Sequence, residues 1–300
     1  MKTILTRWFS RLIYWEIEAV LYVCEESDDM IVDLSLPLTN RIQSEKIRPR
    51  IRHVNHKKGA CVLGLEWLTI GSRCERLRKI FSYIVGSERL VRKDFPDEMG
   101  LAFDVVRTST HCGTHVDAPL HFGPFSENKK SESIDELPLE WFYGNGVLID
   151  VRYKGAGELI SVEDIESSLR NVDYEIKPYD IVLIWTGSDK LWGGKEYVHK
   201  YPGMSREATE WLIDRGVKVI GIDAWGFDKP PSLMLKDYFK TRDKRCLYPS
   251  HFLGRERKYC HIEKMANFDK ITRPFGFKVI CFPIKIQGGT AAWVRAVAII

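Results

Sequence analysis

Short apolar runs punctuate the second half of the chain and predict the strands of a buried sheet. Three of them are nearly continuous and have the length of strands that are covered on both faces: Gly146–Val151, Asp180–Thr186 and Val217–Asp223. Two more β-rich runs, Phe277–Phe282 and Trp293–Ile300, close the chain. The run Met30–Leu38 predicts a further strand that leads into a turn, and we expect the compact domain to begin there.

The segments between these runs carry the signals of helices. Ser161 and Asp164 form a capping-box pattern that predicts a helix to about Arg170, and Ser205 begins a second helix that Gly216 ends. A strand–helix–strand order joins neighbouring strands in parallel through a crossover. The sequence therefore predicts an α/β fold in which a central, mostly buried sheet is flanked by peripheral helices.

Other parts of the chain give weaker patterns. Between residues 41 and 100, short apolar runs alternate with basic residues. Leu77–Val91 is expected to be a helix, although Gly86 lies within it. Residues 259–267 also have a helical pattern.

The first 29 residues form an N-terminal extension. Their apolar character predicts either a docked or interfacial helix or a poorly ordered segment. Charged residues interrupt the apolar run too often for a secretory signal or a membrane span. We expect one main domain over residues 30–300, because no Pro- or Gly-rich linker divides it.

Composition and charge exclude several classes of protein. The 300 residues include 45 basic and 41 acidic side chains, a formal charge of +4, and both signs are interspersed. Nucleic-acid-binding proteins usually gather basic residues on one element, so no nucleic-acid partner is expected, and the dense basic stretch Lys46–Lys58 is interpreted as a solvated strand and turn. The seven cysteines are scattered and form no C-x-x-C pair, which favours a reducing compartment and predicts a cytoplasmic protein.

The candidate chemistry is concentrated between residues 111 and 121. Three of the eight histidines fall there together with one aspartate, in the spacing H-x-x-x-H-x-D-x-x-x-H: His111, His115, Asp117 and His121. A glycine and a proline within the segment argue against a helix interior. On an extended backbone His115 and Asp117 project to the same side, and Gly113 allows the bend that brings His111 to them.

Two imidazoles and a carboxylate suit zinc, manganese or iron, and three protein ligands with an open position are typical of a catalytic metal site. Asp117 has a second oxygen and could bridge two metals, while His121 could act as a general acid or base. The alternative is that these are ordinary polar residues of a loop. Seven specified positions coincide by chance in far fewer than roughly one chain in a million, which favours the metal site.

The segment resembles the H-x-G-T-H-x-D-x-P-x-H signature of the cyclase family, which includes bacterial kynurenine formamidase and isatin hydrolase, and it matches every specified position. Five further segments are similar to family segments: Asp33–Leu38, Asp180–Gly187, Gly221–Ala224, Phe282–Gly289 and Val294–Ala296. His251 and Glu263, twelve residues apart, match a later His and Glu of the family. The resemblance extends from about residue 30 to the end of the chain.

This resemblance implies a swivelling β/β/α fold, a homodimer or higher homo-oligomer, and one or two zinc or manganese ions per chain. It assigns His111, His115 and Asp117 to the first ion, Asp117, His251 and Glu263 to a second, and proton transfer to His121. His261 competes with His251 as a candidate, because it lies only two residues from Glu263.

The function that the resemblance implies is hydrolysis of the carbon–nitrogen bond of an aryl formamide or cyclic amide by a metal-activated water. Two alternatives stay open: lactone or ester hydrolysis or dehydration on the same site, and a metal-dependent small-molecule binding protein without turnover. Leu36, which replaces a usual family His, and the unusual stretch between Pro37 and Asp104 leave the exact substrate open.

Three weaker features complete the predictions. Cys112, inside the motif, is expected to pack and not to act as a nucleophile. Trp225, Phe227 and Trp293 either line an aromatic substrate pocket or belong to the core. Gly288–Gly289 lacks the context of a nucleotide site and is expected to form a turn.

Overall fold

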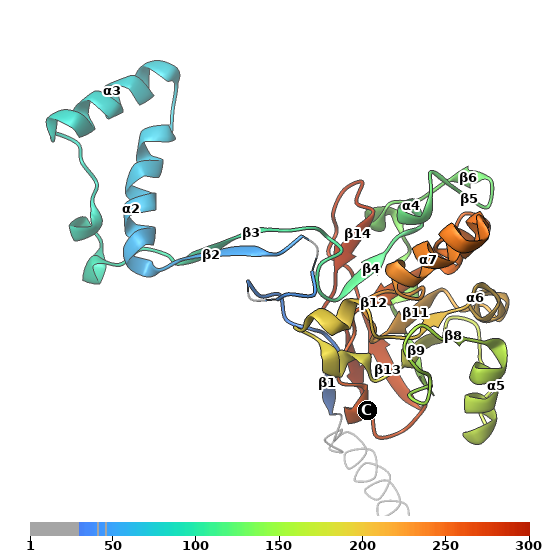
Figure 1. Ribbon diagram of the computed structural model, residues 1–300. Helices are drawn as coiled ribbons and strands as arrows, with labels where there is room; N and C mark the ends of the chain where they lie inside the picture. The colour runs from blue at the N-terminus through green and yellow to red at the C-terminus, as the bar shows by residue number, and fades with distance from the viewer. Residues whose placement is uncertain (1–29, 41, 46) are drawn as a thin grey trace, which may run out of the picture.

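The computed structural model describes residues 30–40, 42–45 and 47–300. A body is built around one large sheet, and an arm made of residues 47–107 projects from it (Figure 1). We refer to residues 30–45 and 108–300 as the body. The candidate metal-binding motif begins just after the arm returns to the body.

The central sheet of the body has nine strands in the order β1-β15-β13-β7-β9-β11-β12-β4-β14. Their bounds are β1 Ile31–Asp33, β4 His115–Asp117, β7 Tyr143–Asp150, β9 Ile181–Trp185, β11 Val219–Ile222, β12 Cys260–Glu263, β13 Phe277–Ile280, β14 Ala291–Trp293 and β15 Val297–Ile299. β7, β9, β11 and β12 are parallel to one another, and the other five strands add in antiparallel fashion on either side. β9 and β11 are almost fully buried, which explains their continuous apolar sequences.

Two apolar cores lie on opposite faces of this sheet. On one face, α5 Val162–Asn171 and α6 Arg206–Asp214 pack their apolar sides over the sheet, with Ile165 and Leu212 in the same buried cluster as Ile184. The other cluster contains Leu183, the neighbour of Ile184 on β9. Alternate side chains of a strand therefore enter different cores, as the period of two residues requires.

Shorter elements complete the body. They are α4 Pro119–Phe122, α7 Pro231–Thr241, α8 Pro249–Leu253, the pair β5 Phe125–Ser126 and β6 Lys129–Lys130, and the pair β8 Leu159–Ile160 and β10 Gly203–Met204. α4 follows β4 directly, α8 precedes β12, and the two short helices pack against each other. They place further polar side chains around the carboxyl end of β4.

The arm is a two-stranded antiparallel ribbon that carries two helices at its far end (Figure 1). Its elements are β2 Arg50–Val54, α2 His56–Glu66, α3 Arg73–Val85, β3 Phe103–Arg107 and the short 3₁₀ turns η1 Trp67–Thr69, η2 Arg92–Asp94 and η3 Pro96–Glu98. These elements make their substantial packing contacts only with one another.

The structure confirms the α/β fold with its buried sheet and its helices. All three continuous apolar runs are strands, and the predicted caps are present, because the Ser161 hydroxyl accepts from the Asp164 N–H and the Ser205 hydroxyl accepts from the Ala208 N–H. Gly216 follows α6 with a positive φ of 88°. Gly288, with a φ of 66°, lies in the predicted turn.

Two predicted helices were wrong in whole or in part. Residues 259–267 contain the strand β12, which lies between β11 and β4 with every residue buried. Their mixed polar and apolar pattern arises because polar residues are buried at a site, and not because a helix face is exposed. The helix predicted for Leu77–Val91 ends at Val85, because Gly86 takes a left-handed φ of 82° and caps it.

Two further segments, each predicted as one unit, contain parts of two elements in the structure. The run Trp293–Ile300 contains parts of two strands, since β14 forms one edge of the sheet and β15 pairs with β1 near the other edge. The basic stretch Lys46–Lys58 includes β2, but helix α2 already begins at His56. The predicted N-terminal extension, residues 1–29, lies outside the described residues. None of the helices in the described part of the chain combines the length and apolar character that a membrane crossing requires.

Candidate active site

The site is centred on β4, a three-residue strand whose residues are all buried. β4 pairs with β12 in antiparallel register, so that Asp117 lies opposite His261 and His115 lies opposite Glu263. Directly opposed side chains of an antiparallel pair have Cβ atoms about 5 Å apart. The sheet register alone therefore brings two imidazoles and two carboxylates together.

A tight turn adds His111 to this group. Gly113 has a φ of 69°, and a Cβ at this position would approach the side chain of Leu38 to 2.9 Å, so that glycine suits the turn on both grounds. The turn places Nδ1 of His111 2.8 Å from Oδ1 of Asp117. The predicted group His111, His115 and Asp117 is thus brought together, on the extended and looped backbone that the sequence predicts.

The hydrogen bonds of His115 fix which ring nitrogen faces the other residues. Its Nδ1 lies 2.8 Å from the carbonyl oxygen of Gly113, which can only accept, so Nδ1 carries the proton. Nε2 is buried, has no hydrogen-bond partner, and faces Oδ1 of Asp117 at 3.3 Å and Oε2 of Glu263 at 3.7 Å. A lone pair and two carboxylate oxygens that converge in this way form a set of donors that can bind a cation.

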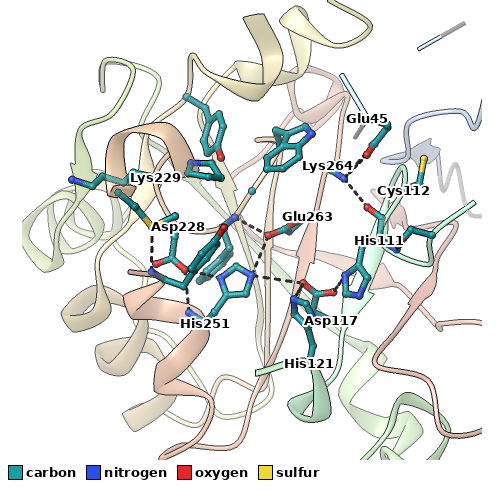
Figure 2. Close-up of a pocket in the computed structure, with 18 of the residues that line it drawn as sticks. Glu45, His111, Cys112, Asp117, His121, Asp228, Lys229, His251, Glu263 and Lys264 are labelled. Atoms are coloured by element: carbon teal, nitrogen blue, oxygen red, sulfur yellow. Dashed lines mark hydrogen bonds and ion pairs between the residues drawn. The ribbon is translucent and has the colours of Figure 1, made fainter. Parts of the chain in front are cut away.

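His251 is oriented in the same way by a different partner. Its Nδ1 lies 2.6 Å from Oδ2 of Asp228, and its Nε2 lies 3.6 Å from Oε1 of Glu263 and 4.0 Å from Oδ2 of Asp117 (Figure 2). The backbone N–H groups of Ser250 and His251 also donate to Asp228, at the start of α8. A carboxylate that holds the far nitrogen of an imidazole is the usual support of a metal-ligating histidine.

Two overlapping groups of potential ligand atoms result, and Asp117 belongs to both. Within each group all ligand atoms lie within 4.8 Å of one another: His111, His115 and Asp117 in the first, and Asp117, His251, His261 and Glu263 in the second. Imidazole and carboxylate donors suit zinc and manganese. The residues of both groups fit a divalent cation, because the donor set and the unpartnered His115 nitrogen suit one.

His261 is the residue that the sequence prediction left undecided. Its Nε2 lies 3.0 Å from Oδ2 of Asp117, and its ring stacks on Phe227 with centroids 4.3 Å apart. The structure brings both His251 and His261 to the second group, so the two candidates do not exclude each other.

His121 lies at the edge of this cluster on α4, with Nε2 3.9 Å from Oδ2 of Asp117. Burial lowers the pKa of His121, the attraction of Asp117 only partly opposes this, and with the nearby imidazoles of His111 and His251 the pKa falls to about 4. The imidazole is therefore neutral at neutral pH and can accept a proton.

The carboxylate at the centre remains ionised in spite of its burial. Burial opposes the charge of Asp117, but the imidazoles of His115 and His121 and the hydrogen bond from His111 hold its pKa well below the usual value. At His251, burial disfavours the charged ring, but the hydrogen bond to Asp228 prevails and raises the pKa to about 9. In the metal-free protein the positive charge on His251 thus stands where a cation would bind.

A cavity of about 250 Å³ opens onto these residues. Of the two alternatives left open for the aromatic residues, both hold for Trp225 and Phe227, which line the cavity and also belong to or pack against a buried core, whereas Trp293 lines a separate groove. Tyr201 also lines the cavity, and its buried hydroxyl has no hydrogen-bond partner within the described residues. Burial raises the pKa of Tyr201 well above its usual value, so this hydroxyl keeps its proton and is available as a donor.

A buried ion pair supports the turn that carries His111. Nζ of Lys264 lies 3.0 Å from Glu45 and donates to the carbonyl oxygen of His111 at 2.6 Å, and Glu45 also accepts from the Gly113 N–H (Figure 2). Cys112, between these residues, is buried, and burial raises its pKa to about 11. The packing role expected for Cys112 agrees with this environment.

Sequence reasoning did not find Glu45, Asp228 and Lys264. Each of them acts on a site residue through a hydrogen bond or ion pair, and their sequence environments carry no metal-ligand spacing. Only Lys264, which directly follows Glu263, lay close enough to a candidate residue to attract attention.

Comparisons with known proteins agree with this geometry. The profile of a family described as "Putative cyclase" matches residues 32–229. A kynurenine formamidase from Salinibacter ruber is 28% identical over 204 residues, 67% of this chain and 81% of the relative, and cyclase-like protein 3 from Oryza sativa subsp. japonica is 24% identical over 198 residues, 65% of this chain and 64% of the relative. Isatin hydrolase A from Ralstonia solanacearum has a TM-score of 0.67 at 20% identity, covering 95% of this chain and 97% of that chain, which confirms the fold.

Proposed function

Because this chain belongs to the cyclase family, we propose that it is a metal-dependent hydrolase that cleaves the carbon–nitrogen bond of an aryl formamide or a cyclic amide. The names of a relative and of a solved structure, a kynurenine formamidase and an isatin hydrolase, support this class of substrate. The domain that carries the activity is residues 30–300.

The observation that carries the proposal is the pair of oriented imidazoles. His115 and His251 commit Nδ1 to Gly113 and Asp228, so both present Nε2 to the carboxylates of Asp117 and Glu263. An ordinary buried polar cluster would be expected to pair donors with acceptors. At His115 an acceptor nitrogen faces acceptor oxygens, and at His251 a positive charge on the imidazole faces them in the metal-free protein, so both positions suit a cation.

We assign His111, His115 and Asp117 to one cation and Asp117, His251 and Glu263 to a second, with His261 beside Asp117 in the second group. Zinc or manganese suits these donors. A bound divalent cation would supply Lewis acidity, which polarises a carbonyl group and lowers the pKa of water.

The protein's own side chains supply the remaining functions. His121, neutral at neutral pH, accepts a proton on its imidazole from the attacking water and returns it to the leaving nitrogen. The aromatic side chains of Trp225 and Phe227 exclude water and accept an aryl or cyclic group. The size of the cavity, about 250 Å³, suits a small molecule.

The scattered cysteines support a place in the cytoplasm, where thiols stay reduced. Among the described residues, six are free cysteines and none is paired in a disulfide. No feature of the site calls for a nucleic-acid partner.

The proposal is tested by a substrate screen of the purified, metal-replete protein with formylated anilines, isatin-like rings and lactones. Hydrolysis of an amide supports the proposal. A preference for lactones or esters would show that the site hydrolyses these substrates instead of amides. A metal-loaded protein that hydrolyses none of them would indicate a binding protein without turnover.

A variant at the proton-transfer residue tests the mechanism. His121→Ala should abolish turnover while the metal content is unchanged, because His121 lies at the edge of both ligand groups. His199→Ala, at an exposed histidine outside the cavity, is the matched control and should retain full activity. Full activity in His121→Ala would refute the assigned role.

A further inference from the structure

His261 lies beneath the cavity and takes no part in the proton transfer assigned to His121. Its ring is fully buried and does not line the cavity. The ring stacks on that of Phe227 with the two planes 7° apart, and it also contacts the ring of Phe122 at a centroid distance of 5.0 Å. In a closely packed interior it cannot turn without displacing both aromatic side chains. Each nitrogen of His261 therefore keeps the neighbour that the structure gives it.

The neighbours of the His261 ring decide which nitrogen carries its proton. Nδ1 lies 3.3 Å from the hydroxyl oxygen of Tyr259. That hydroxyl donates its only proton to the carbonyl oxygen of Ser250 at 2.8 Å, and a carbonyl oxygen can only accept. The hydroxyl oxygen of Tyr259 must therefore accept from His261, so Nδ1 carries the proton of the neutral imidazole.

Nε2 of His261 is then an unprotonated nitrogen that faces two carboxylates. It lies 3.0 Å from Oδ2 of Asp117 and 3.7 Å from Oε1 of Glu263. A lone pair and two carboxylate oxygens all accept hydrogen bonds and none of them donates, so direct contact leaves each of them unsatisfied. A cation among these atoms can bind all three. The arrangement repeats that of His115, which faces the other oxygen of Asp117.

The ligand atoms of the second group have nearly the spacing of a tetrahedral site. One atom from each of its four residues lies within 4.8 Å of the others. Four of the separations are 3.0 Å for Asp117 and His261, 3.6 Å for His251 and Glu263, 3.7 Å for His261 and Glu263, and 4.0 Å for Asp117 and His251. Zinc with tetrahedral bonds of about 2.0–2.2 Å holds its ligand atoms about 3.3–3.6 Å apart. The observed separations lie on both sides of this range, so small side-chain adjustments would complete the site.

We propose that His261 is the fourth ligand of the second cation, so that the second group is closed and the first group keeps the position that is open to substrate. Among the described residues, His111, His115 and Asp117 supply the three ligand atoms of the first group. Three protein ligands are typical of a catalytic site, whereas four are typical of a structural site. The assignment rests on the proposed function, which supplies the divalent cations and the two groups of ligands.

The two groups should then differ in affinity and in coordination. The second group offers one ligand more than the first and a second carboxylate, so it should bind its cation more tightly and fill first. Cobalt(II) reports the difference, because four-coordinate cobalt absorbs visible light strongly and five- or six-coordinate cobalt absorbs it weakly. The cation that binds first should therefore have the spectrum of four-coordinate cobalt.

The test is a titration of the metal-free full chain with cobalt(II), followed by visible absorption and, against a competing chelator, by affinity. We expect two equivalents for the natural sequence, of which the tighter one absorbs strongly. Loss of a residue that only supports a ligand lowers metal affinity about 10–100-fold, so His261→Leu, which removes a ligand atom, should weaken the tight equivalent at least about 100-fold. The weaker equivalent should remain. His111→Ala is the reciprocal variant, and it should lose the weaker equivalent and keep the tight one.

A second variant keeps the imidazole and changes only its support. Tyr259→Phe removes the oxygen that accepts from Nδ1 of His261, so the tight equivalent should weaken about 10-fold while the weaker one is unchanged. Tyr197→Phe is the matched control, because it removes a buried hydroxyl that donates to the carbonyl oxygen of Asp223, and it should leave both equivalents unchanged.

The circular dichroism spectrum of each metal-free variant should be that of the natural protein, which shows that a lost cation is not a lost fold. A folded His261→Leu protein that keeps the tight equivalent and its strong absorption would overturn the inference, because His261 would then only donate a hydrogen bond to Asp117. Weak absorption from the tight equivalent of the natural protein would also overturn it. A protein that binds cobalt as expected but hydrolyses no substrate would contradict the proposed function and support the assignment of His261.

Discussion

Replacing Asp228 by asparagine tests how the second group of ligands is held. Asp228 accepts three hydrogen bonds, from the backbone N–H groups of Ser250 and His251 and from Nδ1 of His251. An asparagine keeps the size of the side chain, but it loses the charge and offers one acceptor oxygen. At least one donor is then left facing an amide NH₂.

The size of the effect follows from these contacts. A hydrogen bond to a charged group contributes about 1.5–3 kcal/mol, and loss of such a support typically lowers metal affinity about 10–100-fold. We therefore expect Asp228→Asn to weaken metal binding about 10–100-fold, and to destabilise the metal-free protein by about 1–3 kcal/mol through the unsatisfied donor.

The assay is a competition titration against a fluorescent chelator, together with chemical denaturation of the metal-free protein. Asp237→Asn, at a surface carboxylate paired with Lys229, makes the same chemical change away from His251 and should leave both quantities unchanged. A folded Asp228→Asn protein with unaltered metal affinity would refute the role given to Asp228.

Two further predictions follow from the pKa of His251 and from the hydroxyl of Tyr201. In the metal-free protein His251 keeps its proton up to a pKa of about 9, above the ordinary 6.5, so its contribution to stability is complete below pH 6.5 and is lost as the pH rises to 9. Because a ligand must be deprotonated, metal affinity should increase over the same range in a titration at constant ionic strength, and a pH-independent affinity would contradict this. Tyr201→Phe should lower kcat/KM about 10-fold, the effect of losing one ordinary hydrogen bond to substrate, without changing metal content. Tyr197→Phe, which removes the hydrogen bond to the carbonyl oxygen of Asp223, should lower stability and leave kcat/KM unchanged. Equal kcat/KM for Tyr201→Phe and the natural enzyme would show that the Tyr201 hydroxyl does not contact substrate.

The sequence predicts the site best where the residues that form it lie close together along the chain. His111, His115 and Asp117 lie within seven residues, so the geometry of one strand and one turn decides their convergence. The buried strands β9 and β11 and the capped helices α5 and α6 follow from patterns of comparable length. These elements were predicted with nearly the correct bounds.

Contacts that depend on the pairing of strands far apart in the sequence could not be predicted in this way. His261 meets Asp117 across 144 residues of sequence, and only the register of β12 with β4 selects this partner. The buried strand β12 was mistaken for a helix because His261 and Glu263 give it a polar pattern.

In the arm, too, a local sequence pattern does not tell which side of a helix is buried. Apolar residues at helical spacing in α3 predict a face turned toward a core, whereas the structure buries Lys79 and exposes Phe81 and Ile84. Which side of a helix is covered depends on what it packs against, and the described part of the chain buries the polar side of α3.

The central claim, that the residues around Asp117 bind a divalent cation, is tested most directly by elemental analysis of protein purified without chelators. We expect one or two zinc or manganese ions per chain in the natural protein, and loss of bound metal in both Asp117→Ala and the isosteric Asp117→Asn, with an unchanged circular dichroism spectrum for the latter. Stoichiometric metal retained by Asp117→Ala, or a natural protein that stays metal-free after exposure to zinc and manganese, would contradict it.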